Sequence, residues 1–266
     1  MSKMNIVVVN YNNSQCTLDL IKSIEDKEIY INEFIVVDNS SSECEVDLLK
    51  ENNTSLDVKF IFLEDNVGYF HGLNKGIDCL RSKEVYPTFI GNNDLIFSDD
   101  FFINFFNREY EADTLAVAPC FKTMDGVYQN PAQPKKPTRF KRVFYALYFF
   151  NYNVGSLIYK AWVMLGLSAQ SSLSKDYDSR NIYLGMGAGY IILPRFFNEY
   201  KRLIYPNFLY GEEAFLSKQI EDANGCLFYD ANLDILHLES VATAKLPSKD
   251  KYAMMKKSYL IYRDYF

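Results

Sequence analysis

The sequence lacks the marks of several common protein classes. Its five cysteines are odd in number and scattered, with no CxxC pair, which favours reduced thiols over a disulfide framework. No apolar run reaches the roughly 18 residues that a membrane-spanning helix needs. The net charge of −6 provides no general basic footprint for nucleic acid. The chain also begins with a strand pattern instead of the long apolar region of a signal peptide, so we expect a cytoplasmic protein.

Glycine is missing where the commonest nucleotide-binding loops need it. The stretch after the first predicted strand, residues 10–14, contains no glycine and no lysine, so the GxGxxG fingerprint is absent there. No GxxxxGK[ST] loop occurs either. The same gap counts against a sugar-phosphate nucleotidyltransferase, which needs a glycine-rich basic loop for its triphosphate. A diphosphate bound here needs another counter-charge, and a divalent cation held by a carboxylate is the natural substitute.

Strand and helix patterns alternate over the first hundred residues. Short apolar, β-branched runs predict buried strands, and apolar residues at helical spacing lie between them. This alternation implies right-handed βαβ crossovers and a mostly parallel sheet. The predicted strands are residues 6–9, 34–37, 58–63, 89–90, 115–121, 188–193, 226–229 and 235–238, with a helix at 212–224 and a hairpin turn at Asp125-Gly126.

The sequence predicts an α/β fold in one domain, with a mostly parallel central sheet flanked by helices. No internal repeat or low-complexity linker divides the chain. We expect one half over residues 1–100 and a second half over residues 101–240. The second half includes a helical insertion rich in aromatic and basic residues at 131–181. A helical tail at 241–266 follows.

Polar residues follow each of the first four predicted strands. Each of them alone is an ordinary turn former. The C-terminal ends of parallel strands lie along one edge of a sheet, where ligands bind, so the four groups together predict a nucleotide-binding site. The residues are Asn10, Tyr11 and Asn12 after the first strand, Asp38 after the second, Asn66 and Gly68 after the third, and Asn92, Asn93 and Asp94 after the fourth.

Five motifs carry a resemblance to a known family. In order they are VVVNYNN, IVVDNSS, NVGYFHGLNKGI, FIGNNDLIF and YGEEAFLSKQIEDANGCLFY with ILHLES. They occur in the order seen in family 2 inverting glycosyltransferases, and over residues 4–130 and 185–240 the chain most resembles the bacterial rhamnosyl/galactosyl branch. The resemblance implies a GT-A fold and an inverting sugar transfer from a UDP- or dTDP-sugar. It also implies a saccharide acceptor, carried on a polyprenyl diphosphate, for O-antigen or capsule synthesis at the inner face of the cell membrane.

The resemblance also implies roles for residues at the strand ends. Asp38 would bind the base or ribose of the donor nucleotide. The residues beside it in the implied donor site are Asn10, Tyr11, Asn12, Asn66, Gly68, Asn74, Asn92 and Asn93. Asp94 is the one carboxylate in the Asn-Asn-Asp stretch that stands where the family has its D-x-D motif, and it would bind Mg²⁺ or Mn²⁺. His237 alone reads as a core residue of a strand, but the resemblance makes it a second metal ligand.

Sugar transfer also requires a general base, because the attacking hydroxyl must lose a proton. Glu212 and Glu213 are the candidates. By themselves they read as acidic residues in the first turn of a helix, where the dipole favours them. The resemblance matches them to a Glu-Asp pair whose second member is the base, which favours Glu213 and leaves Glu212 as the alternative.

An aromatic and basic segment at residues 135–165 has three readings. Five basic residues come first and aromatic residues follow at once, a combination suited to an anionic membrane surface. The segment could instead be a helical lid that packs its aromatic residues on the sheet, or a dimer interface. For the whole protein, a nucleotide-sugar-binding module without activity is the alternative to an enzyme. Binding alone, however, does not require Asp94, Glu213 and His237 together.

Overall fold

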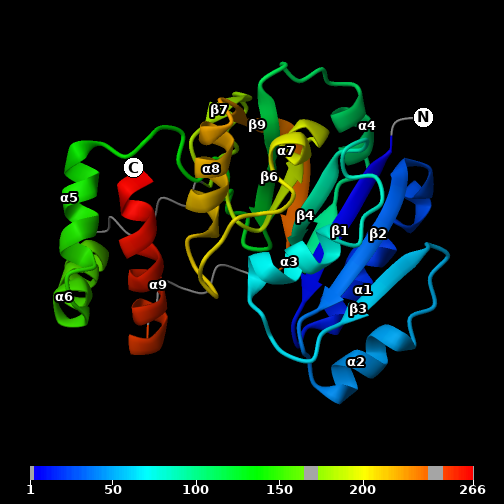
Figure 1. Cartoon of the computed structure of the whole chain (residues 1–266), viewed down its shortest axis with the longest axis horizontal. Helices are drawn as coiled ribbons and strands as arrows, with labels where there is room; N and C mark the ends of the chain where they lie inside the picture. Colours follow the sequence, from blue (N-terminus) through cyan, green and yellow to red (C-terminus); the bar gives the residue numbers. More distant parts are fainter. Residues whose placement is uncertain (1–2, 165–172, 239–247, 266) are drawn as a thin grey trace.

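The computed structural model of the chain describes residues 3–164, 173–238 and 248–265. One sheet runs through these residues, in the strand order β3-β2-β1-β4-β8-β6-β9-β5, with β7 paired to β9 (Figure 1). The strands are β1 (Met4–Asn10), β2 (Ile31–Asp38), β3 (Val58–Phe62), β4 (Thr88–Asn92), β5 (Leu95–Phe97), β6 (Thr114–Thr123), β7 (Arg180–Ile182), β8 (Gly189–Ile192) and β9 (Cys226–His237).

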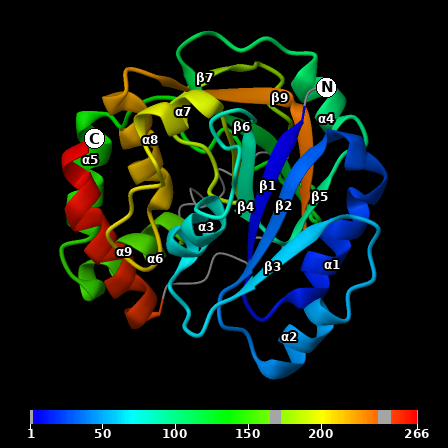
Figure 2. The same ribbon diagram turned by 45° about the vertical axis from the view of Figure 1, so that its right-hand side comes forward.

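Helices lie on both faces of the sheet and beyond one end of it (Figures 1 and 2). They are α1 (Ser14–Ser23), α2 (Glu43–Lys50), α3 (Tyr69–Ile77), α4 (Phe101–Phe106), α5 (Arg139–Tyr148), α6 (Tyr152–Met164), α7 (Pro194–Glu199), α8 (Glu212–Asp222) and α9 (Lys249–Tyr262), with short 3-10 turns at Glu25–Tyr30 and Arg263–Tyr265. The predicted α/β fold with a mostly parallel sheet is confirmed.

The parallel half of the sheet aligns the strand ends. Strands β3, β2, β1 and β4 are parallel neighbours. Their register pairs Asn10 with Asp38, and Val9 with Asn92. The polar residues predicted to follow β1, β2 and β4 therefore leave the sheet from neighbouring strands, at the same edge.

Alternation along β1 and β2 divides the core between the two faces of the sheet. Val7 and Val9 face α3, whose Phe70 and Leu73 are fully buried. Ile6 and Val8 face the opposite way and pack in the other apolar cluster, with residues of α1. Helix α3 lies so close to the sheet that a Cβ on its Gly76 would collide with Val7.

The second half of the sheet differs from the prediction in two ways. β8 is antiparallel to both of its neighbours, β4 and β6. Residues 226–229 and 235–238, predicted as two strands, belong to the single strand β9 apart from Leu238. The polar stretch between them is absorbed as a bulge, since the register with β6 jumps from Asp230 to Asp234 between Pro119 and Cys120. The Asp230 carboxylate accepts the amide hydrogen of Asn232 and closes that bulge.

The insertion and the C-terminal tail form a separate helical group, α5, α6 and α9, beyond α8 at one end of the molecule (Figures 1 and 2). Aromatic residues of the insertion pack on α9: the Phe149 and Tyr259 rings stack with centroids 4.5 Å apart. Tyr252 joins this cluster and donates its hydroxyl to the Tyr148 carbonyl. Residues 165–172, 241–247 and 266 of the predicted insertion and tail lie outside the described residues.

Candidate active site

Asn10 connects three strand ends at the polar edge of the sheet. Its Nδ2 donates to Asp38 Oδ2 at 2.7 Å, and its Oδ1 accepts from Asn93 Nδ2 at 2.9 Å. Asp38 Oδ1 accepts the amide hydrogen of Ser41 at 2.9 Å. Asp38 is only 1% exposed, so both carboxylate oxygens are committed inside the protein. Asp38 and Asn93 thus fix the loops around the edge, while Tyr11 and Asn12 of the same edge are exposed.

The loop after β3 is held by a second amide network. Asn39 Nδ2 donates to Asn66 Oδ1 at 2.9 Å, and Asn39 Oδ1 accepts from the amide of Val67. Gly68 follows with a φ of 87°, and a Cβ there would collide with the Phe208 carbonyl. Glycine is needed at that position because the loop before α8 rests on its backbone. Gly68 therefore positions the segment that leads to the two glutamates.

Asn74 is turned toward a different part of the chain. Its Nδ2 donates to the Leu203 carbonyl at 2.8 Å, and its Oδ1 accepts the Leu203 amide hydrogen at 2.9 Å. Both polar atoms of the Asn74 side chain therefore hold the segment before α8. The Asn92 side chain, by contrast, is partly exposed at the end of β4.

Asp94 and His237 come together because β5 pairs with β9. Asp94 directly precedes Leu95, whose register partner is His237. His237 Nε2 lies 3.1 Å from Asp94 Oδ2, and His237 Nδ1 lies 2.8 Å from Gln129 Oε1. Asp94 is 3% exposed, yet its Oδ1 has no hydrogen-bond partner.

This pair fits a divalent cation. Gln129 bonds Nδ1 of the His237 ring and fixes its orientation, so that Nε2 faces the Asp94 carboxylate. A cation bound by His237 Nε2 and the Asp94 carboxylate would also satisfy the orphaned Oδ1. In the described part of the chain, no group of three or more His, Cys, Asp or Glu residues could hold a metal. A cation held here would therefore take its remaining ligands from water or substrate oxygens.

Glu212 and Glu213 begin α8 after two residues of left-handed backbone, Tyr210 and Gly211. Glu213 reaches across to the segment before β8, where a Cβ on Gly187 would collide with its carboxylate. The Tyr69 hydroxyl donates to the Gly187 carbonyl at 3.0 Å and so joins α3 to the same loop. Burial raises the pKa of the Tyr69 phenol, and the nearby charges of Glu212, Glu213 and Asp94 add to the shift.

Burial is the main influence on both glutamates. It raises the pKa of Glu212 to about 8, and the neighbouring Glu213 charge adds to the shift. Burial also raises the pKa of Glu213, although its own amide and that of Gly187 bond the carboxylate and act in the opposite direction. A base works best when its pKa lies near the working pH, so a raised pKa suits a glutamate that removes a proton near neutrality.

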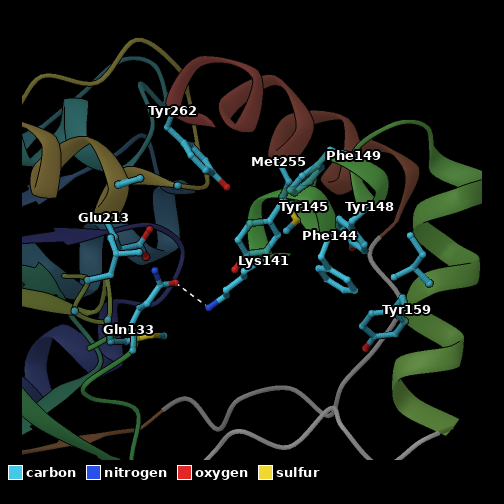
Figure 3. A pocket seen from close by; sticks show the side chains of 17 residues that line it. Gln133, Lys141, Phe144, Tyr145, Tyr148, Phe149, Tyr159, Glu213, Met255 and Tyr262 are labelled. Carbon is cyan, nitrogen blue, oxygen red and sulfur yellow. Dashed lines mark hydrogen bonds between the residues drawn. The ribbon is translucent and has the colours of Figure 1, made fainter. Parts of the chain in front are cut away.

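Glu213, but not Glu212, is among the residues that line a cavity of about 580 Å³ between the helical group and the start of α8 with its neighbouring loops. Figure 3 shows its side chain pointing into this aromatic cavity beside Gln133, opposite aromatic residues of α5 and α6. The cavity lining also includes Tyr262 of α9.

Tyr69, Gln129 and Gly187 were not singled out from the sequence. Tyr69 is the residue after Gly68, and Gly187 belongs to the glycine-rich run GMGAG, a local signal that the backbone approaches another group there. Gln129 carries no such signal, because its partner His237 is 108 residues away.

Comparisons with known proteins agree on a family and a fold. Residues 5–163 match the model of glycosyl transferase family 2. No curated protein sequence matches the chain. Among solved structures, S. aureus TarS 1–349 in complex with UDP-GlcNAc aligns at a TM-score of 0.60 and 12% identity, over 97% of this chain and 66% of that one. GalNAc-T7 with UDP, GalNAc and Mn²⁺ aligns at a TM-score of 0.61 and 14% identity, over 100% and 50%. The chain spans half to two thirds of these two proteins.

Replacing Glu212 by Gln should stabilise the protein in alkali. The folded state holds the Glu212 proton up to about pH 8, whereas the unfolded chain loses it near its usual value of 4.5, so stability falls as pH rises between these values. Thermal melts should show Glu212→Gln gaining about 1–4 kcal/mol over wild type at pH 9 and much less at pH 4. The exposed Glu84→Gln is the control and should show no such trend. An equal difference at both pH values would contradict the assignment.

Proposed function

Since this chain belongs to glycosyl transferase family 2, we propose that it moves a sugar from a nucleoside-diphosphate sugar to a hydroxyl of a saccharide acceptor, with inversion at the anomeric carbon. The observation that carries this proposal is the arrangement around Tyr69. The Asp94 carboxylate, with its orphaned oxygen beside His237, and the glutamates of α8 lie near the same phenol. Inverting transfer requires these two functions near one another: charge for the leaving diphosphate and a base for the attacking hydroxyl.

The donor in this proposal is a UDP- or dTDP-sugar bound along the polar edge. UDP and UDP-GlcNAc in the two similar structures support a uracil nucleotide. Exposed Tyr11 and Asn12 would contact the nucleotide, with Asn92 beside them. Asp38 would bind the base or ribose of the nucleotide. The buried Asn10, Gly68, Asn74 and Asn93 and the partly buried Asn66 would hold the loops around it in place.

Asp94 and His237 would hold Mg²⁺ or Mn²⁺, and Mn²⁺ in the GalNAc-T7 structure supports such a cation. When bound, the cation would neutralise the charge that develops on the departing diphosphate. Glu213 would accept the proton of the attacking hydroxyl, because it faces the cavity by which an acceptor can approach. Glu212 would stay protonated beside it near neutral pH, since its pKa is about 8.

We propose the rhamnosyl/galactosyl branch and O-antigen or capsule synthesis as the setting, with an acceptor on a polyprenyl diphosphate. In this division of labour residues 1–100 bind the nucleotide, residues 101–240 bind the acceptor, and α9 covers the insertion. A module that only bound nucleotide-sugars would not need the Glu213 carboxylate to face the aromatic cavity.

The outer face of α5 supports a position on the inner membrane surface. Phe140, Val143 and Leu147 recur at helical spacing and are exposed, Phe140 by 82%. Arg139 and Arg142 are exposed on the same helix. An apolar stripe beside positive charge suits the boundary between anionic headgroups and acyl chains. Within the residues described, no helix is long and apolar enough to cross a membrane, so contact through this segment would lie in the plane.

The five basic residues of the segment are not equivalent. Lys136 pairs with Glu221, and Lys141 turns toward Gln133 in the aromatic cavity. Lys135, Arg139 and Arg142 are exposed and form no ion pair with a carboxylate of the described residues. The membrane-facing charge is therefore assigned to these three.

Replacing Glu213 by Gln should lower the rate of sugar transfer by about 10²–10⁴, because the proton acceptor is lost while its size is kept. Affinity for UDP, measured by calorimetry, should change little. Glu212→Gln is the matched variant and should keep most of the activity. A wild-type rate in Glu213→Gln with an inactive Glu212→Gln would show that the neighbouring glutamate is the base.

Removing the cation should stop transfer. EDTA should abolish activity, and Mn²⁺ or Mg²⁺ should restore it in wild type but not in Asp94→Asn. Manganese binding followed by electron paramagnetic resonance should weaken in Asp94→Asn and His237→Gln. Asp99→Asn, which changes a side chain 97% exposed, should bind as wild type does. Full activity after EDTA and exhaustive dialysis would contradict the metal assignment.

Wild type should cosediment with liposomes that contain phosphatidylglycerol, and less as salt rises. The triple variant Lys135→Gln, Arg139→Gln, Arg142→Gln should lose most of this binding. A control that removes three exposed charges elsewhere, Lys59→Gln, Lys75→Gln, Lys201→Gln, should not. Equal binding by the two triple variants, or no binding by wild type at low salt, would overturn the membrane assignment.

A further inference from the structure

Lys141 is a cationic side chain inside the aromatic cavity without a carboxylate partner among the described residues. It extends from α5, and its Nζ lies 3.0 Å from Gln133 Oε1 (Figure 3). Its neighbour Lys136, by comparison, has Glu221 as a partner. Burial lowers the pKa of the Lys141 ammonium, so part of its hydration is lost without a compensating negative charge.

The position of this ammonium is fixed by the fold. Gln133 and Leu184 exchange two backbone hydrogen bonds, 3.0 and 2.9 Å long, so Gln133 is anchored to the segment before β8. The Gln133 side chain also donates to the Lys135 carbonyl at 3.0 Å. Lys141 is therefore directed to a rigid point on the same wall from which Glu213 faces the cavity. Its ammonium also lies over the Tyr145 ring, 5.8 Å from the centroid.

The remaining wall is apolar and aromatic. Phe144, Tyr148 and Tyr159 line the cavity from α5 and α6, and Met255 lines it from α9. Helix α5 thus has two apolar faces: Phe144 and Tyr148 face the cavity, while Phe140, Val143 and Leu147 are exposed on the outside.

We propose that this cavity receives the acceptor at the point where its apolar chain joins a phosphate or diphosphate, and that Lys141 binds that anion. The inference rests on the proposed glycosyl transfer and assigns the residue that binds the anion of its acceptor. The apolar chain lies against the α5 and α6 aromatics, and the saccharide beyond the phosphate presents its hydroxyl to Glu213. Lys141 is a specificity-determining residue, because it distinguishes an anionic amphiphile from a neutral saccharide of the same size.

Geranyl diphosphate is a suitable probe, because it carries both chemical features and no sugar. Binding is measured by calorimetry in EDTA without nucleotide, so that no cation at Asp94 can hold the diphosphate. Wild type should bind geranyl diphosphate more tightly than geraniol or inorganic diphosphate. Lys141→Gln should weaken it by about tenfold to a hundredfold, the usual contribution of a hydrogen bond to a charged group, while it can still bond Gln133.

Two matched variants separate charge recognition from structure. Lys141→Arg keeps the charge and should restore most of the affinity, and Lys257→Gln, an exposed lysine of α9, should bind as wild type does. Geraniol should bind Lys141→Gln and wild type equally. Undiminished geranyl diphosphate binding by Lys141→Gln would overturn the inference, as would inorganic diphosphate binding as tightly as geranyl diphosphate.

This test does not depend on catalysis. If no nucleotide-sugar supports transfer but Lys141 still controls geranyl diphosphate binding, the proposed function fails and the anionic amphiphile site stands. If transfer occurs and Lys141→Gln has the wild-type KM for a diphosphate-linked acceptor, the acceptor site fails and the proposed function stands.

Discussion

The site depends on one buried side chain, Asn10. Its amide donates to Asp38 and accepts from Asn93, so a single group joins the ends of β1, β2 and β4. An amide suits this place because it offers a donor and an acceptor on one planar group. With Asn93 held inward, the next residue, Asp94, leaves the sheet beside His237 on β9. The carboxylate that would bind a cation is therefore oriented by residues that need not touch the donor.

A second constraint positions Glu213, the proposed base. The loop before α8 rests on Gly68, and the Glu213 carboxylate rests on Gly187, so two glycines allow the approach that brings α8 to the sheet edge. The approach buries both glutamates and raises the pKa of each. Burial of Glu212 lowers the stability of the fold at alkaline pH. Burial of Glu213 gives the proposed base a raised pKa, which suits proton removal.

Much of the edge could be predicted from the sequence, because short-range patterns determine it. Apolar runs that end in Asn or Asp marked the ends of β1, β2 and β4, and these residues do lie together. The pairing of Asp94 with His237 had no local signal and followed only from the family resemblance, since it depends on β5 meeting β9. Asn74 could not be assigned its partner Leu203, 129 residues away, for the same reason.

Helical geometry separates the basic residues of the insertion onto different faces of α5. These residues form one group along the chain, but helical geometry turns each residue about 100° from the last. Lys141 therefore faces the cavity while Arg139 and Arg142 remain exposed. What the sequence could not provide is the partner of this segment: its aromatic residues pack on α9, which lies about a hundred residues further along the chain and carries little amphipathic pattern of its own.

A crystal structure with UDP and Mn²⁺ tests the central claim most directly. The account predicts a cation bound by Asp94 and His237, with the orphaned Asp94 oxygen or its neighbour as a ligand and the diphosphate completing the shell. It also predicts that the Asn10 network is unchanged. A cation bound elsewhere, with Asp94 and His237 still in direct contact and UDP away from the ends of β1, β2 and β4, would contradict it.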